Sequence, residues 1–569
     1  MKKIVYTLLA TLLLVTGCDF LEPENKSNGA SSAEYFGTSE GFESLVNSAY
    51  AALKEIYKGD PKLFCAGTDL YADGGHSIDI ALHRYTSLIS SNAGVKDFYS
   101  KCYQGVESAN CVLYYSDKTE ITNTLPLRIA EARFLRGFFY YMLVQHFGDV
   151  AIMREYSNAV LEELPRDSKA DVYNFIMDEW KDIIDNSELP EEDRTGRVSK
   201  QAVRHFLAKL YLVRGWDADC AQDDDFSNAA AYAEAAIAGK GLTIPFGELW
   251  SPENENNDEF IFSVQYDRNA LIGSVGVTGG HSQQNYFCVS LKEPTEGHKG
   301  GAASYVATLR SIKLFGAHDT RWEGTFMNIL YKYNGKDRPE TGYYAYYRNN
   351  QLDTLRIEAY YPREFEASPD QIAAWRAVDP EKRNNTSVVP MTATTVRVFD
   401  GVSPISYEEA IRTDAYGGIC VRKFDDPESV HGTGSSFRDI VLARLGETYL
   451  VAAEAYFKMN QLDKAAEKIN VVRRRAAEPG FELDVHANDI TLDFILEERG
   501  RELFGEYHRW MDLKRTGKLI EYNELYNKDM AGSASDLMKG KDGQYKLLRP
   551  IPQDAIDLNK AEIKQNPGY

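Results

Sequence analysis

Two adjacent helical patterns between Arg444 and Ala476 restrict the folds open to this chain more than any other stretch. In RLGETYLVAAEAYFK, large and small apolar residues recur at spacings of three and four, which predicts a helix with one buried face. A polar break, MNQ, precedes a second helix, LDKAAEKINVVRRRA, with a matching face. Such a hairpin cannot bury its apolar face alone and needs stacked neighbours, as in tetratricopeptide repeats. The positions that carry the pattern are Tyr449, Ala453, Tyr456, Ala465, Ile469 and Val472.

Further amphipathic segments supply those neighbours. The stretch SKQAVRHFLAKLYLVRG, followed after an acidic loop by NAAAYAEAAIAGKG, has the composition of a second, looser hairpin. We therefore predict a mainly α fold, built as a tetratricopeptide-like helical-repeat scaffold. The other helices are expected at residues 38–57, 96–116, 129–153, 168–185 and 495–519.

Helical periodicity fades between residues 244 and 435, where Gly, Asn, Pro and Thr become frequent. Short runs such as Glu259–Tyr266 and Thr395–Phe399 have the composition of strands. So much irregular sequence inside a compact protein usually carries the function, and we expect an irregular α+β insertion there. We expect a signal peptide at residues 1–17 and a polar tether at 18–37. An N-terminal helical part with the first repeat units follows at 38–243, and the ligand-binding insertion is expected at 244–435. Residues 436–569 are expected to form the C-terminal helical part with the hairpin.

The first residues predict export. Lys2 and Lys3 precede an apolar run from Ile4 to Val15, which is too short to span a bilayer but suits a secretory signal. The run ends in LVTGC, which resembles a bacterial lipobox and makes Cys18 the expected site of lipidation. An ordinary signal with an incidental cysteine is the alternative. Because several acyl chains on one residue give lasting attachment, we expect a protein anchored to a membrane and not spanning it.

Charge and cysteine spacing exclude several functional classes. The net charge is −21 and the sequence pI is about 5.1, so the chain lacks the basic face that nucleic-acid binding needs. The six remaining cysteines are widely scattered, with no CxxC and no zinc-ligand spacing, and we expect buried single thiols. They are Cys65, Cys102, Cys111, Cys220, Cys288 and Cys420.

Four stretches together resemble the RagB/SusD family of Bacteroidetes outer-membrane lipoproteins, and with the lipobox the resemblance covers the whole chain. Two of them are ARFLRGFFYYMLVQHFGDVAIM at residues 132–153 and the hairpin at 444–476. The two more specific ones are EERGRELFGEYHRWMDLKRTG at 497–517 and PIPQDAIDLNKAEIKQNPGY, which closes the sequence. An arbitrary helical-repeat protein has no reason to contain QNPGY after such a run.

The resemblance implies a binding function without a reaction. Such proteins are helical scaffolds with four tetratricopeptide-like units on one side and a loop-built ligand surface on the other. They capture a ligand, usually a glycan, and deliver it to a SusC-like TonB-dependent outer-membrane transporter, which the repeats face. The resemblance thus implies a nutrient-uptake lipoprotein, lipid-anchored in the outer membrane and facing the cell surface. Asp19 beside the lipidated cysteine would instead favour inner-membrane retention under enterobacterial sorting rules.

Two other functional classes compete with glycan binding. A surface glycoside hydrolase needs a carboxylate pair at a set separation, and with 85 acidic residues such pairs occur by chance. No GxSxG, HExxH or P-loop occurs in a usable context. A lid protein with a peptide cargo is the third class.

Sugars offer apolar C–H faces and a rim of hydroxyls, so a site needs aromatic platforms with carboxylates, amides or arginine beside them. In relatives such residues come from the loop region after the first helix and from the central insertion, and we expect the site there. For each aromatic candidate burial in the core is the alternative, and the run Tyr343–Tyr347 is equally well read as a strand. The candidate ligand-binding residues are Asp69, Tyr71, Asp73, His76, Tyr85, Tyr266, Arg268, Tyr286 and Trp322.

Some of these candidates have further interpretations. Asp69 and Asp73 are suited to capping a helix or forming a turn. With Asp79 they also form a weak calcium pattern that lacks EF-hand spacing, and no other metal or cofactor is expected. If Trp322 and Tyr71 are platforms, replacing either by Ala weakens glycan binding and leaves the fold intact.

Overall fold

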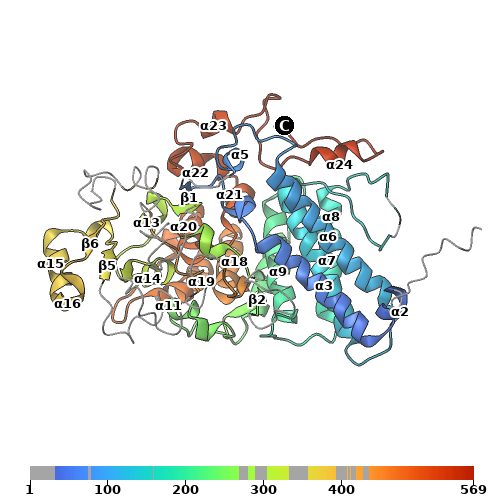
Figure 1. Cartoon of the computed structure of the whole chain (residues 1–569), viewed down its shortest axis with the longest axis horizontal. Helices are drawn as coiled ribbons and strands as arrows, with labels where there is room; N and C mark the ends of the chain where they lie inside the picture. Colours follow the sequence, from blue (N-terminus) through green and yellow to red (C-terminus); the bar gives the residue numbers. More distant parts are fainter. Residues whose placement is uncertain are drawn as a thin grey trace, which may run out of the picture.

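The structure is a computed structural model. It describes residues 32–74, 79–157, 159, 161–267, 280–288, 304–331, 357–392, 407, 411, 418–426 and 435–569. Long helices dominate these residues, and short strands join them in the central part of the chain (Figure 1). The predicted mainly α fold is therefore confirmed.

The first four long helices are α3 (Ser39–Tyr57), α6 (Ala93–Ser116), α7 (Leu125–Phe147) and α8 (Lys169–Asn186). α3 packs on α6, α6 on α7 and α7 on α8, and together they form the blue and cyan layer on the right of Figure 1. Thr38, Asn92 and Ser168 precede three of these helices, and each side-chain oxygen accepts a backbone N–H of the first turn. These caps explain why the helices begin where they do.

Both predicted hairpins are present and lie against each other. The helices are α9 (Lys200–Trp216), α10 (Asp225–Ile237), α18 (Leu445–Lys458) and α19 (Leu462–Ala476). α9 packs on α10, α10 on α18 and α18 on α19. Tyr449 donates its hydroxyl hydrogen to the Lys240 carbonyl at 2.7 Å, and Tyr456 donates to Glu234 at 2.9 Å. The large residues of the repeat pattern therefore join one hairpin to the next.

The stretch 495–519 was predicted as one helix, and that prediction is wrong. It contains α20 (Leu492–Glu502) and α21 (Arg509–Arg515), separated by a tight turn. Gly505 in this turn has a φ of +86°, a left-handed conformation that no α-helix continues. Its N–H donates to the Tyr71 hydroxyl oxygen at 2.7 Å in place of a helical carbonyl.

The described residues form three small sheets, two of which join the central part of the chain to segments outside it. β1 (Tyr71–Asp73) pairs antiparallel with β3 (Tyr305–Ala307), and β2 (Phe260–Val264) pairs antiparallel with β7 (Ile440–Arg444). The predicted strand at 259–266 is thus confirmed, whereas Thr395–Phe399 lies outside the described residues. The third sheet lies on the left of Figure 1, and its order is β4 (Ile329–Tyr331), β5 (Ile357–Tyr360) and β6 (Ser387–Val388).

Short helices complete the described part of the chain. None of the helices there is long and apolar enough to cross a membrane. The short α-helices are α2 (Ser32–Phe36), α4 (Lys62–Cys65), α5 (Ile80–Arg84), α11 (Phe246–Leu249), α12 (Gln283–Tyr286), α13 (Leu309–Lys313), α14 (Arg321–Thr325), α15 (Pro369–Val378), α16 (Pro380–Arg383), α22 (Leu519–Tyr526), α23 (Ala534–Leu537) and α24 (Gln553–Asp557). The 3₁₀ turns are η1 (Pro252–Asn254), η4 (Glu364–Glu366) and η5 (Ala487–Asp489).

A cluster of buried ion pairs, which we call the central ion cluster, holds β7, α19 and α20 together. Arg444 at the end of β7 pairs with Glu259 at 2.9 Å, with Glu502 of α20 at 2.6 Å and with Glu506 at 2.7 Å. Arg475 of α19 pairs with Glu259 at 2.8 Å and also with Glu502. Burial alone would raise the pKa of Glu502, but the Arg475 and Arg444 guanidiniums lower this pKa to about 2.

The same cluster attaches the central part of the chain to the helices. Arg321, the first residue of α14, is fully buried and pairs with Glu498 at 2.8 Å and with Glu502 at 3.1 Å. Lys423 pairs with Glu506 at 2.6 Å. Because an unpaired buried charge is very costly, these segments stabilise one another only when all of them are in place.

Replacing Glu502 by Gln is expected to lower the free energy of unfolding by about 3–5 kcal/mol, because three buried guanidiniums lose a shared negative charge. The matched control is Glu497→Gln on the same helix, since the Glu497 side chain is 31% exposed and pairs with Arg310, which is 20% exposed, and only distantly with Arg501 at 3.9 Å. The control substitution is expected to lower the free energy of unfolding by less than about 1 kcal/mol. Urea denaturation followed by circular dichroism measures both values, and equal losses would contradict the role of the central ion cluster.

Stability is also expected to fall in acid. In the folded protein the pKa of Glu502 is about 2, and that of Asp512 is about 2 because Arg499 and Arg515 outweigh its burial. Both values lie below the ordinary carboxyl pKa of about 4, so the stabilisation is complete above roughly pH 5 and is lost as the pH falls from about 5 to about 2. The thermal unfolding midpoint should drop across this interval, and less so in Glu502→Gln. A midpoint that stays constant down to pH 2 would refute this expectation.

Candidate ligand-binding face

The two regions predicted to supply the ligand site lie side by side. The antiparallel pairing of β1 with β3 sets Asp73 opposite Tyr305 and Tyr71 opposite Ala307. The loop region after the first long helix therefore shares one small sheet with the central part of the chain, although more than 200 residues separate them in the sequence.

Three of the predicted aromatic platforms are core residues. The exposed fraction is 2% for Tyr71 and 0% for both Tyr85 and Trp322. Trp510 donates its indole N–H to the Tyr85 hydroxyl at 2.8 Å, and Trp322 packs against Phe326 with ring centroids 5.0 Å apart. The expectation that these three rings offer open faces to a ligand is wrong, because large aromatics are stabilised most by full burial.

Asp69 is also a structural residue. Its two carboxylate oxygens accept hydrogen bonds from Arg509 at 2.7 and 2.6 Å, and the side chain is fully buried. Asp79 accepts from the Leu82 N–H at 3.2 Å and so caps α5. In the described part of the chain, no group of three or more His, Cys, Asp or Glu side chains is placed to hold a metal ion. The weak calcium pattern of the sequence thus gains no support from the geometry.

The remaining candidates divide into accessible residues and residues without a described position. His76 and Arg268 lie outside the described residues, as does the Tyr343–Tyr347 run. Asp73 and Tyr286 are partly exposed, and both lie next to Tyr305.

We define the Tyr286 face as the partly exposed side chains of Asp60, Lys62, Asp73, Arg84 and Tyr286. The Tyr286 ring centroid is 6.5 Å from that of the buried Tyr305, whose hydroxyl donates to the Asp60 carboxylate. Burial raises the pKa of Asp60, and Lys62 lies 3.6 Å from its other oxygen.

An arginine beside Asp73 completes the face. The Arg84 guanidinium lies 3.3 Å from the Asp73 carboxylate and 3.8 Å from that of Asp529, and the Arg84 side chain is 41% exposed. The face thus combines an aromatic ring with carboxylates and cations, the groups that bind the apolar faces and hydroxyl rim of a sugar. Asp73 and Tyr286 are ligand candidates predicted from the sequence, and their role stays a prediction; Asp60, Lys62 and Arg84 are added to them by position alone.

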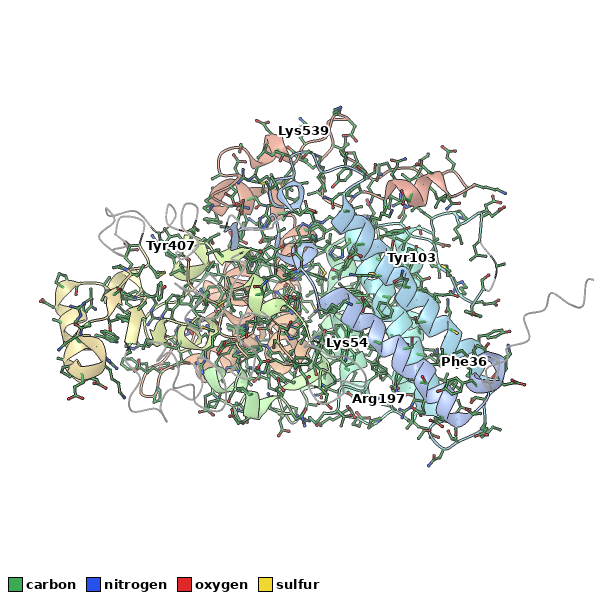
Figure 2. All side chains as sticks on the ribbon, viewed as in Figure 1. Phe36, Lys54, Tyr103, Arg197, Tyr407 and Lys539 are labelled. Carbon is green, nitrogen blue, oxygen red and sulfur yellow. The ribbon has the colours of Figure 1, made fainter. Side chains whose placement is uncertain are left out.

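Tyr266 borders a separate, basic pocket of about 220 Å³. The Lys54 ammonium lies 4.8 Å from the Tyr266 ring centroid, and Lys54 lines the pocket together with Arg197 and Gln265. Figure 2 labels Lys54 and Arg197 below the centre of the molecule. Arg197 is already engaged by Glu131 at 2.9 Å, so much of its charge is neutralised within the protein.

A larger groove of about 570 Å³ lies along α6, and we call it the α6 groove. Its floor includes Tyr99 and Tyr103 of α6, with ring centroids 4.9 Å apart, and residues 551–563 form one wall. Figure 2 labels Tyr103 on the helical layer to the right. Glu107 also lines the groove; burial raises its pKa, and its Oε2 has no hydrogen-bond partner among the described residues.

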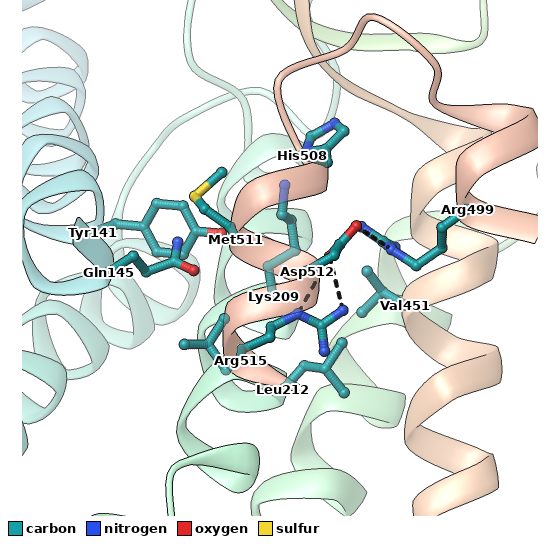
Figure 3. A pocket seen from close by; sticks show the side chains of 11 residues that line it. Tyr141, Gln145, Lys209, Leu212, Val451, Arg499, His508, Met511, Asp512 and Arg515 are labelled. Carbon is teal, nitrogen blue, oxygen red and sulfur yellow. Dashed lines mark hydrogen bonds and ion pairs between the residues drawn. The ribbon is translucent and has the colours of Figure 1, made fainter. Parts of the chain in front are cut away.

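A third cavity, drawn in Figure 3, is too small for a saccharide. It lies where α7, α9, α20 and α21 meet and has a volume of about 10 Å³, which is the room that one water molecule needs. The Asp512 side chain lines this cavity and pairs with Arg499 at 2.7 Å and with Arg515 at 2.9 Å. This cavity is a feature of the core and not a ligand site.

Residues 258–569, more than half of the chain, match the SusD family. The chain belongs to the SusD family. Residues 19–212 match a further family, described as starch-binding associating with outer membrane. The two matches together span both the helical layer that contains α6 and the ion cluster around Glu502.

Known SusD-like proteins resemble the chain over most of its length. The starch-binding protein SusD of Bacteroides thetaiotaomicron is 26% identical over 479 residues, which cover 80% of this chain and 76% of that protein. SusD-like protein P2 of Formosa agariphila is 24% identical, with 100% of both chains covered. A solved laminarin-binding SusD-like protein superposes with a TM-score of 0.64 at 20% identity, covering 94% of this chain and 100% of that one, which shows a shared fold.

Trp322→Ala is expected to destabilise the fold by about 3–5 kcal/mol, because removal of a fully buried indole leaves a cavity. Phe365→Ala is the control, since Phe365 is an aromatic residue in the same part of the chain with 45% exposure. Phe365→Ala is expected to change the free energy of unfolding by no more than about 0.5 kcal/mol. Thermal unfolding of the two variants tests this, and a Trp322→Ala protein as stable as the wild type would contradict the core assignment.

Proposed function

We propose that this SusD-family member is a non-catalytic, surface glycan-binding lipoprotein that captures an oligo- or polysaccharide and delivers it to a SusC-like TonB-dependent transporter. Family membership is the observation that carries the proposal. Relatives named for binding starch and laminarin support a glycan as the ligand. The lipobox-like stretch before Cys18 supports a lipid anchor in the outer membrane, facing the cell surface.

We place the glycan on the Tyr286 face. A pyranose stacked on the accessible side of Tyr286 buries its apolar C–H face, while its hydroxyls donate to Asp73 and accept from Arg84. The Asp73 position is held by its own N–H, which donates to Asp529 at 3.1 Å, and by the β1–β3 pairing. Because these groups are fixed before binding, little conformational entropy is lost when the sugar arrives.

Tyr286→Ala and Arg84→Ala are each expected to weaken glycan binding by about 5- to 30-fold, which corresponds to roughly 1–2 kcal/mol of lost contact. Affinity electrophoresis against a panel of starch, laminarin and other polysaccharides first identifies the ligand, and isothermal titration then gives the affinities. Tyr103→Ala in the α6 groove is the matched tyrosine control and should bind normally. If only the Tyr103 variant loses affinity, the glycan binds in the α6 groove and the Tyr286 face is not the site.

The same incubations distinguish the competing functions. Retention of a polysaccharide without release of reducing ends supports capture without cleavage. Release of reducing ends would instead identify a glycoside hydrolase. Binding of peptides with no retention of any polysaccharide would identify a lid for peptide cargo.

A further inference from the structure

Two cysteines far apart in the sequence meet in the core. The Sγ atoms of Cys288 and Cys420 are 2.9 Å apart, although 132 positions separate the residues. Each side chain is 2% exposed. A disulfide bond is about 2.0 Å long, so a shift of about 0.9 Å brings these sulfur atoms to bonding distance.

The backbone around the two thiols holds them together. The Val421 N–H donates to the Phe287 carbonyl at 3.1 Å, and the Met327 N–H donates to the Cys420 carbonyl at 2.9 Å. The Phe287 ring stacks on Phe424 with centroids 4.8 Å apart. Phe287 and Val421, the residues next to the two cysteines, are therefore held by contacts that do not involve sulfur. The fold itself brings the two thiols together.

We propose that Cys288 and Cys420 form a disulfide bond in the exported protein. The two thiols lose two electrons and two protons, and a disulfide-bearing oxidant, such as an envelope thiol oxidoreductase, is reduced to two thiols. The exchange passes through a mixed disulfide on one of the two cysteines. Export is expected from the signal-like sequence before Cys18, and disulfides persist in compartments outside the cytoplasm.

The bond closes a long loop within the central part of the chain. Cys288 lies two residues after Tyr286, and Cys420 precedes β7, which joins the hairpin α18–α19. A crosslink between them limits the unfolded chain more strongly than a short-range one, since the loop it closes is long. The expected result is a frame and a Tyr286 face that stay assembled when the protein is challenged by heat.

The first test maps the thiols of the full chain. The full chain is refolded in a mixture of reduced and oxidised glutathione, so that the oxidant reaches the thiols before they are buried, and is then denatured in N-ethylmaleimide and digested without reductant for mass spectrometry. The expected product is one crosslinked peptide pair containing Cys288 and Cys420, while Cys65 and Cys102 carry the maleimide. Maleimide on both Cys288 and Cys420 after oxidation would overturn the proposal. This result is independent of glycan binding, so its failure leaves the proposed function untouched.

The second test compares stability in the two redox states. The midpoint of thermal unfolding of the oxidised wild type should fall by several degrees on addition of dithiothreitol. The double variant Cys288→Ser, Cys420→Ser should not respond to dithiothreitol, whereas Cys102→Ser, a buried control, should respond as the wild type does. An equal response of the wild type and the double variant would overturn the assignment, and the peptide map decides the matter where the double variant fails to fold.

Discussion

The buried charges around Glu502 are the constraint on which the rest of the structure depends. Arg444, Arg475 and Arg321 approach this one carboxylate from β7, α19 and α14, and all four side chains are at most 2% exposed. The desolvation cost of each buried charge is offset only by the opposite charges that pair with it. The hairpin α18–α19, the helix α20 and the central part of the chain therefore assemble as one unit, and the family stretch at 497–517 owes its many charged residues to this packing and not to a ligand.

The candidate face is held by the same part of the chain. Arg509, at the start of α21, pairs with the buried Asp69, and the Gly505 N–H in the preceding turn donates to the Tyr71 hydroxyl oxygen. Both contacts fix the segment that leads into β1 and hence the position of Asp73. If Asp73 binds the ligand as we propose, it needs little rearrangement on so well anchored a segment, and preorganisation of this kind raises affinity without adding contacts.

Sequence reasoning succeeded where a repeating spacing reports directly on burial. The spacing of Tyr449, Ala453 and Tyr456 predicted the hairpin, because only one face of a helix meets its neighbour. No such period exists around Tyr71 and Trp322, so their burial depended on partners distant in the sequence. The break at Gly505 is not evident from the sequence, because its flanks have helical composition and its N–H donates to the hydroxyl of Tyr71, which is distant in the sequence. Cysteine spacing likewise gave no sign of the Cys288–Cys420 contact, since a fold, not a motif, brings the two together.

The residues of the family frame and the residues that we propose as the ligand site differ in burial and therefore in their effect on stability. The charges of the central ion cluster and the apolar faces of the hairpins are buried, so a substitution there costs several kcal/mol. Arg84 and Tyr286 are partly exposed, and substitutions at such positions usually change stability by less than about 0.5 kcal/mol. A common frame can therefore persist at 20% identity, as the superposition with the laminarin-binding protein shows, while exposed side chains are free to vary. The same physics explains why the family can be identified from the sequence of the frame, whereas the exposed residues that we propose as the ligand site are less constrained by packing.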